Sequence, residues 1–377
     1  PTPTPEESPP ATATPEGYQL AEATPIPIST PAAPAGPAEG EVLVLSADGQ
    51  ALTIVDATTN KPRASVEFDF PGRGVAVSPD GARAWVTQGQ EGASEVAVID
   101  VEGASRGGHA LVRGGAWDVA FSHDGSRAFV SLCEADAVAF LDATSGREFA
   151  RIALGKAAPR ADLPRCPRGL ATARTPLGEV LYVAGSGSGV VWVLDVVTGK
   201  QLAEVPVGGN PSRLVVSPAG DRVYVAVPSL HQVVVLDADR REEVDRLEFG
   251  GEVGGVALSR DGSLLYVTGP SSGLLWVWDL AVRGVTSSIP IGRDPSDVVF
   301  AAEGSAAYVA LRGENAIAVV DPFKVEEVAT VPVGAAPVSL AYRLPVKKSE
   351  ATSEPSSPTP TPLPSPTPFS LQEPEPV

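Results

Sequence analysis

The sequence predicts an all-β fold: one seven-bladed β-propeller of four-stranded antiparallel blades, with extended Pro/Thr-rich tails at both ends. Four short runs rich in Val, Leu, Ile and Tyr recur in each repeat, separated by Gly, Pro, Asp and Ser clusters that indicate turns between antiparallel strands. Four strands per repeat, repeated around a ring, are typical of a propeller. In each repeat, the third apolar run ends on an Asp. These residues are spaced by 44, 42, 53, 42, 42 and 42 positions: Asp56, Asp100, Asp142, Asp195, Asp237, Asp279 and Asp321. We expect these carboxylates to accept hydrogen bonds from their own turns and not to converge on one ligand.

Two tails flank the repeats. Residues 1–40 and 344–377 together hold 21 of the 38 prolines, and proline favours extended polyproline II structure over strand or helix. Two interpretations stay open: disordered linkers, or tails that are glycosylated or dock on a partner. Candidate O-glycosylation residues are Thr2, Thr4, Thr12, Thr14, Thr24, Thr30, Thr359, Thr361, Ser365 and Thr367. Candidate docking residues are Tyr18, Leu20, Ile26, Ile28, Phe369 and Leu371.

The propeller is expected over residues 41–343. The chain enters it near 41–45, in the second strand of the first blade. Each later repeat then runs from its innermost to its outermost strand. The last strand, near 338–343, supplies the inner strand that the first blade lacks, so that the ring closes without a covalent link.

The repeat motifs indicate which kind of propeller repeat the sequence contains. Turn motifs such as Ser78-Pro79-Asp80-Gly81 and Ser259-Arg260-Asp261-Gly262 precede strands such as Val223-Tyr224-Val225-Ala226 and Leu265-Tyr266-Val267-Thr268. The third strands end in motifs such as Val98-Ile99-Asp100. These motifs resemble the YVTN-type, surface-layer-like β-propeller repeat family of prokaryotic secreted and surface-layer proteins. The resemblance covers residues 41–343 and implies the fold, while the repeat of that family implies little about activity.

The two cysteines are expected to pair. Cys133 follows a second strand, and Cys166 lies in the insertion that explains the 53-residue spacing. Loops after second and fourth strands open on the same face of a propeller, so both cysteines lie near one blade. A disulfide is the preferred interpretation, with two free thiols or a metal site as alternatives.

Few residues predict a functional site. The first positions of the inner strands, at the channel mouth, are Gly74, Asp118, Gly169, Arg213, Gly255, Asp297 and Ser339. The charged members, Asp118, Arg213 and Asp297, are weak ligand-site candidates, and a solvated entrance is the preferred interpretation because four of the seven are Gly or Ser. The histidines, His109, His123 and His231, fall in different repeats, and no catalytic residue, metal site or cofactor is predicted. The tryptophans, at positions 85, 117, 192, 276 and 278, are expected mostly in the core.

Composition excludes several function classes. A formal net charge of −18 argues against nucleic acid and against anionic lipid as partners. No apolar run reaches the length of a transmembrane segment. The sequence begins at Pro1 and lacks Met, from which we expect removal of a signal peptide and an extracellular location. Scarce Asn and absent Met suggest a hot habitat.

The preferred function is that of a secreted, non-enzymatic structural protein: a building block of an extracellular assembly, such as a filament, that self-associates through its glycosylated tails. The first alternative is a monomeric cell-surface ligand-binding propeller on glycosylated stalks. A propeller hydrolase or lyase is the second alternative, which would require a metal or an acid/base cluster at the channel mouth.

Overall fold

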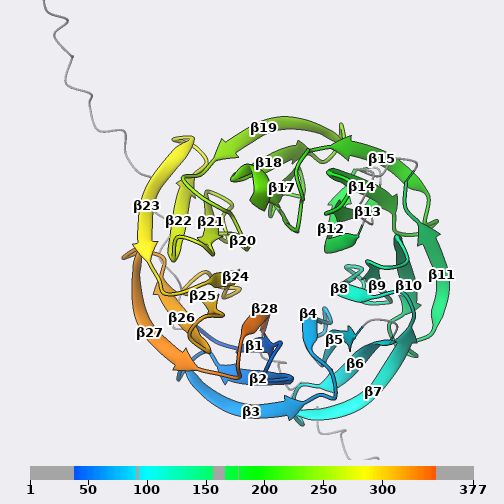
Figure 1. Ribbon diagram of the computed structural model, residues 1–377, viewed down its shortest axis with the longest axis horizontal. Helices are drawn as coiled ribbons and strands as arrows, with labels where there is room; N and C mark the ends of the chain where they lie inside the picture. Colours follow the sequence, from blue (N-terminus) through cyan, green and yellow to red (C-terminus); the bar gives the residue numbers. More distant parts are fainter. Residues whose placement is uncertain (1–37, 91–92, 156–165, 177, 345–377) are drawn as a thin grey trace, which may run out of the picture.

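The computed structural model describes residues 38–90, 93–155, 166–176 and 178–344 of the chain. In this part, 28 strands form seven four-stranded antiparallel sheets arranged as blades around a central channel (Figure 1). The predicted all-β, seven-bladed propeller is therefore confirmed. All of the tail residues proposed for glycosylation or docking lie outside the described residues.

The blades are numbered here in chain order, and their strands are given from the channel outward. Blade 1 contains β28 (Pro337–Arg343), β1 (Glu41–Ser46), β2 (Ala51–Asp56) and β3 (Lys61–Glu67). Blades 2 and 3 contain β4 (Gly72–Val77), β5 (Arg83–Gln90), β6 (Ala93–Asp100), β7 (Ser105–Val112), β8 (Ala116–Phe121), β9 (Arg127–Leu132), β10 (Ala137–Asp142) and β11 (Glu148–Ala153). Blades 4 and 5 contain β12 (Pro167–Thr175), β13 (Gly178–Gly185), β14 (Val190–Asp195), β15 (Gln201–Pro206), β16 (Arg213–Val216), β17 (Arg222–Val227), β18 (Gln232–Asp237) and β19 (Glu242–Glu248). Blades 6 and 7 contain β20 (Val256–Leu258), β21 (Leu264–Gly269), β22 (Leu274–Asp279), β23 (Gly284–Pro290), β24 (Pro295–Phe300), β25 (Ala307–Leu311), β26 (Ala316–Asp321) and β27 (Glu326–Pro332).

The core lies between neighbouring blades. The second and third strands of a blade are apolar on both faces, as in β14 and β17, because each sheet packs against a blade on either side. In the outer strand β19, exposed side chains alternate with half-buried or buried ones. A short 3-10 helix, η1 (Pro228–Leu230), follows β17. No helix within the described residues has the length and apolarity needed to cross a membrane.

The seven repeated aspartates have the predicted role. Each carboxylate accepts backbone N–H groups from the turn that follows its third strand; Asp56, for example, accepts from the Thr59 amide at 2.7 Å, and Asp279 accepts from the Val282 amide at 2.9 Å. The turns lie one per blade, so the seven carboxylates do not form a single site.

The ring closes as predicted, through the pairing of the first and last strands. β28 pairs with β1 in an antiparallel register from Glu41 opposite Arg343 onward. The Arg343 guanidinium is almost completely buried, donates to the Glu41 carboxylate at 2.5 Å and donates to the Gly81 carbonyl of blade 2 at 2.6 Å. Arg63 contacts the other oxygen of Glu41 at 2.7 Å. The closure therefore joins two strands of blade 1 and the neighbouring blade through one buried ionic group.

Candidate functional site

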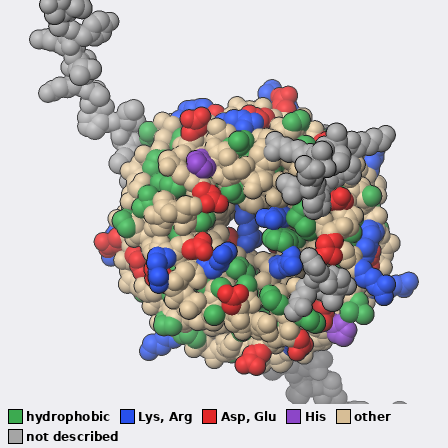
Figure 2. All heavy atoms as spheres, viewed as in Figure 1, with side chains coloured by type: hydrophobic (Ala, Val, Ile, Leu, Met, Phe, Trp, Pro, Cys, Tyr) green, Lys and Arg blue, Asp and Glu red, His purple; other side chains and the backbone are tan. Residues whose placement is uncertain are grey.

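A cavity of about 340 Å³ lies at one end of the channel, and its lining includes a ring of seven residues, one from the innermost segment of each blade. Basic side chains border the central opening (Figure 2). The seven residues are Arg73, Trp117, Arg168, Ser212, Gly254, Ser296 and Val338, with Gly72, Arg213 and Arg312 completing the lining. Each member of the seven lies one position before the residue that the sequence predicted at the mouth. The ring that lines the cavity is therefore offset by one residue from the predicted positions, of which Arg213 also lines the cavity.

Two arginines and a tryptophan form the cationic half of this mouth. The Arg73 and Arg168 guanidinium carbons lie 4.7 Å and 4.2 Å from the centroid of the Trp117 ring, which is the distance of cation–π contacts. Neither arginine forms an ion pair with any described residue, and the buried Nε of Arg168 has no hydrogen-bond partner among them. Trp117 is half-buried at the channel and not a core residue, which corrects the expectation for this tryptophan.

Arg213 forms the floor of the cavity. It begins β16 in blade 5, and its Nη2 donates to the carbonyl oxygen of Val338 in blade 1 at 3.0 Å. The same nitrogen lies 3.6 Å from the Asp297 carboxylate of blade 7. Burial opposes the charge of Arg213, yet Asp297 and Asp118 together raise its pKa above the ordinary value. The side chain thus crosses the channel and links three blades.

Asp118 and Asp297 hold neighbouring blades together. The Asp118 carboxylate accepts a hydrogen bond from the Val119 amide of its own strand. It accepts a second one, at 3.0 Å, from the Leu170 amide of the next blade. Asp297 repeats this arrangement with the Leu340 amide at 2.9 Å. Burial raises the pKa of Asp118, while the Arg213 charge acts in the opposite direction. Of the three predicted ligand-site candidates, Arg213 is the one that lines the cavity.

The glycines in the predicted ring permit close approach of the inner strands. A Cβ at Gly169 would lie 2.5 Å from the Ser212 carbonyl oxygen, and a Cβ at Gly74 would lie 2.6 Å from an Asp118 carboxylate oxygen. Small residues at these positions therefore reflect packing between blades, which corrects their interpretation as a solvated entrance.

The predicted disulfide between Cys133 and Cys166 is present beside the mouth. Cys133 follows β9, and its amide donates to the Gly115 carbonyl oxygen at 2.9 Å, two residues before Trp117. Cys166 lies two residues before Arg168. The disulfide therefore ties together the two segments that carry Trp117 and Arg168.

Arg312 lies at the rim, after β25, with a mostly exposed side chain. Its Nε is 3.0 Å from the Asp294 carboxylate. The charge of Arg312 is thus offset by a neighbouring acid, unlike the charges of Arg73 and Arg168.

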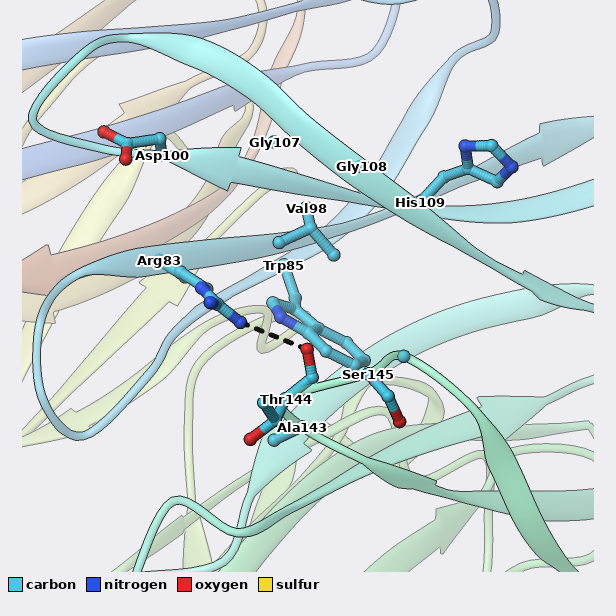
Figure 3. Close-up of a pocket in the computed structure, with 11 residues that line it drawn as sticks. Arg83, Trp85, Val98, Asp100, Gly107, Gly108, His109, Ala143, Thr144 and Ser145 are labelled. Carbon is cyan, nitrogen blue, oxygen red and sulfur yellow. Dashed lines mark hydrogen bonds between the residues drawn. The ribbon is translucent and has the colours of Figure 1, made fainter.

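A second cavity, of about 320 Å³, lies between blades 2 and 3 (Figure 3). Trp85 from β5 occupies its centre, and Arg83 Nη1 donates to the Thr144 carbonyl oxygen at 3.4 Å. The His109 and Asp100 side chains point away from the cavity, and Asp100 instead accepts from the Gly103 amide in its turn. Because its polar groups do not converge, this cavity is a weaker candidate than the channel mouth.

Metal-ligating groups do not gather in the described ranges: no set of three or more His, Cys, Asp or Glu side chains there could hold a metal ion. The Nδ1 of His123 lies 2.8 Å from the Glu179 carboxylate at the protein surface. His231 follows η1 in a left-handed turn conformation.

Comparisons with known proteins identify the fold. No family model matches the sequence, so the resemblance to YVTN-type repeats gains no support from this comparison. No curated protein matches it either. Solved structures with the same architecture include hydrazine synthase from Kuenenia stuttgartiensis, with 20% identity, a TM-score of 0.64 and coverage of 81% of this chain and 99% of that chain. A putative 6-phosphogluconolactonase from Bacteroides fragilis has 15% identity, a TM-score of 0.68 and coverage of 81% and 98%. Dihydro-heme d1 dehydrogenase has 18% identity, a TM-score of 0.56 and coverage of 82% and 77%. At these identities the likeness shows the fold alone.

These comparisons correct the functional expectation. The sequence favoured a non-enzymatic building block of a filament, whereas the three structural neighbours bear the names of enzymes. The expectation of a filament subunit is therefore wrong and is set aside.

Proposed function

We propose that this protein is a ligand-binding propeller that binds a small organic anion at the mouth of its channel. The observation that carries the proposal is the pair of guanidinium groups on Trp117, since Arg73 and Arg168 have no acidic partner among the described residues. Guanidinium groups bind carboxylates and phosphates through paired, charge-assisted hydrogen bonds. Two arginines without an acidic partner in the described part of a chain of net charge −18 support the binding of an anion.

The shape of the mouth supports a small ligand. Its volume of about 340 Å³ lies near the lower end of the range for ligand pockets, roughly 300–1,000 Å³. Four of the seven ring residues, from Ser212 to Val338, have small or uncharged side chains, and Arg213 and Arg312 also line the cavity on this half of the ring. This half leaves room for the uncharged body of a ligand whose anionic group contacts Arg73 and Arg168.

The proposal concerns binding and assigns no reaction. The acids nearest the mouth, Asp118 and Asp297, hold backbone amides of adjacent blades and so have a packing role of their own. The enzyme names of the structural neighbours support a propeller that binds small molecules. One of these names, putative 6-phosphogluconolactonase, refers to a phosphorylated compound. One fold carries many functions, so the reactions of those neighbours are not transferred to this chain.

We also infer that the protein works outside the cytoplasm. Disulfides persist in oxidising compartments, and the Cys133–Cys166 disulfide lies beside the proposed site. This location agrees with the expectation of a secreted protein.

Calorimetric titration with sulfate and with succinate tests the proposal. We expect saturable binding of one anion per chain, and we expect Arg73→Gln and Arg168→Gln each to weaken it about tenfold, as the loss of one charge-assisted contact does. The matched control is Arg147→Gln, an exposed arginine in the turn between β10 and β11. Absence of saturable binding to the wild-type protein, or an equal loss in the Arg147 variant, would refute an anion site at the mouth.

A further inference from the structure

Four arginines line the mouth, and three aspartates of the described residues act on two of them: Asp297 and Asp118 on Arg213, and Asp294 on Arg312. Four guanidinium groups reach the cavity, and two of them have acids nearby: Arg312 lies 3.0 Å from Asp294, and Arg213 lies 3.6 Å from Asp297. The other two, Arg73 and Arg168, have no acid within ion-pair distance in the described part of the chain. Arg73 and Arg168 are therefore the two cations of the cavity lining that lack an ion pair with a described residue.

These two charges are held together by one aromatic ring. Both guanidinium groups contact Trp117, at 4.7 Å and 4.2 Å from its centroid. Burial lowers the pKa of Arg168, and the charges of Arg73 and Arg213 lower it further, so the cations at the mouth oppose one another. Repulsion between cations in a partly buried site is relieved when an anion binds between them. One negative charge relieves part of this repulsion, and two relieve more.

We infer that the mouth selects dianions over monoanions, so that the natural ligand carries a doubly charged group, either a phosphate monoester or a compact dicarboxylate. This inference rests on the proposed function and specifies its ligand class. The doubly charged group lies against Arg73 and Arg168. The uncharged remainder of the ligand faces Ser212, Gly254 and Ser296 on the other half of the ring.

The surroundings of these residues favour a hydroxyl-bearing remainder. The Ser296 hydroxyl donates to the Pro337 carbonyl oxygen at 2.9 Å, which leaves its oxygen lone pairs to accept from a ligand hydroxyl. Gly254 has no side chain, and a Cβ there would meet the Thr268 hydroxyl at 2.7 Å. Ser296 and Gly254 thus form a small, polar part of the lining.

The first experiment compares sulfate with methanesulfonate at constant ionic strength. Both present sulfur-bound oxygens, but sulfate carries two charges and methanesulfonate carries one. We expect sulfate to bind about tenfold more tightly, since each charge-assisted contact is worth that factor or more. In Arg168→Gln and in Arg73→Gln, sulfate affinity should fall to nearly that of methanesulfonate, whereas methanesulfonate affinity should change much less.

The second experiment changes the charge of one ligand. Methyl phosphate passes from monoanion to dianion near its second pKa of about 6. We expect its affinity to rise about tenfold between pH 5 and pH 7.5, in proportion to the dianion fraction. Sulfate stays doubly charged over this range, so any pH dependence of its affinity arises from ionisation of the protein groups at the mouth: Asp118, Asp294, Asp297 and the four arginines. Sulfate affinity should not rise over this range.

The outcomes separate the two proposals. If sulfate and methanesulfonate bind equally, or if methyl phosphate and sulfate follow the same pH dependence, the dianion preference is overturned while the anion site stands. If none of these anions binds, the proposed function fails and the preference fails with it. A preference for sulfate that the Arg73 and Arg168 variants abolish, together with the rise for methyl phosphate, supports both.

Discussion

The Nη2 of Arg213 donates to the carbonyl oxygen of Val338 at 3.0 Å, although the two residues are 125 positions apart and belong to blades 5 and 1. In a ring of seven blades, these two blades lie on opposite sides of the channel (Figure 1). The floor of the proposed site is therefore also a cross-link of the scaffold. A side chain that binds across the ring both limits the depth of the cavity and couples the blades that line it.

Replacing Arg213 with Met tests this coupling. The variant keeps most of the side-chain volume but leaves the buried carboxylates of Asp297 and Asp118 without their cation. Loss of one partner of a largely buried pair costs about 3 kcal/mol, so we expect the free energy of unfolding to fall by about that amount. Urea denaturation at pH 7, followed by circular dichroism, measures the change.

The control for this variant is Arg283→Met. Arg283 also contacts an acid, Asp245, at 2.6 Å, but its side chain is mostly exposed. Surface pairs contribute about 0–1 kcal/mol, so this variant should unfold almost as the wild type does. Equal losses in the two variants would mean that Arg213 does not link the blades.

The disulfide provides a second prediction. Replacing both Cys133 and Cys166 with Ser opens a loop of 33 residues, for which chain entropy gives a loss of about 3–4 kcal/mol. Because Cys166 is two residues before Arg168, we also expect sulfate affinity to fall. Denaturation and calorimetry of the same variant measure both effects. Unchanged sulfate affinity would show that the bond stabilises the propeller without positioning Arg168.

The sequence predicted the propeller well because the fold depends on spacing. The seven aspartates, the insertion that contains Cys166 and the closing strand all follow from the order of residues along the chain. The mouth depends on which face of a strand each residue occupies, and side chains alternate between faces at every residue. An error of one position in the predicted ring therefore named Gly74 and Gly169 in place of the cavity-lining Arg73 and Arg168. Arginines directly before glycines, in an acidic chain, were the available signal.

Arg343 gives a third prediction. Its guanidinium is almost completely buried and contacts Glu41 and the Gly81 carbonyl oxygen, so Arg343→Met leaves Glu41 with the exposed Arg63 as its remaining cation. We expect a loss of about 3 kcal/mol and faster proteolysis of blade 1, since this group joins the first and last strands. Limited proteolysis with mass spectrometry locates the cut. Cleavage spread evenly over the blades would contradict a role in closure.

The pH dependence of stability gives the last prediction, and Asp118 sets its sign. Burial raises the pKa of Asp118 above the ordinary 3.8. At pH values between the ordinary pKa and the raised pKa of the folded state, the folded protein retains a proton that the unfolded chain has released. Asp118 therefore contributes stability that is complete below the ordinary pKa and is lost as pH rises through the folded-state pKa. Asparagine cannot ionise, so the difference in unfolding free energy between wild type and Asp118→Asn isolates this titration from any constant cost of the substitution. We expect the wild type to lose stability relative to the variant as pH rises from 3 to 7, measured by urea denaturation at each pH; a constant difference, or a relative gain by the wild type, would contradict the raised pKa.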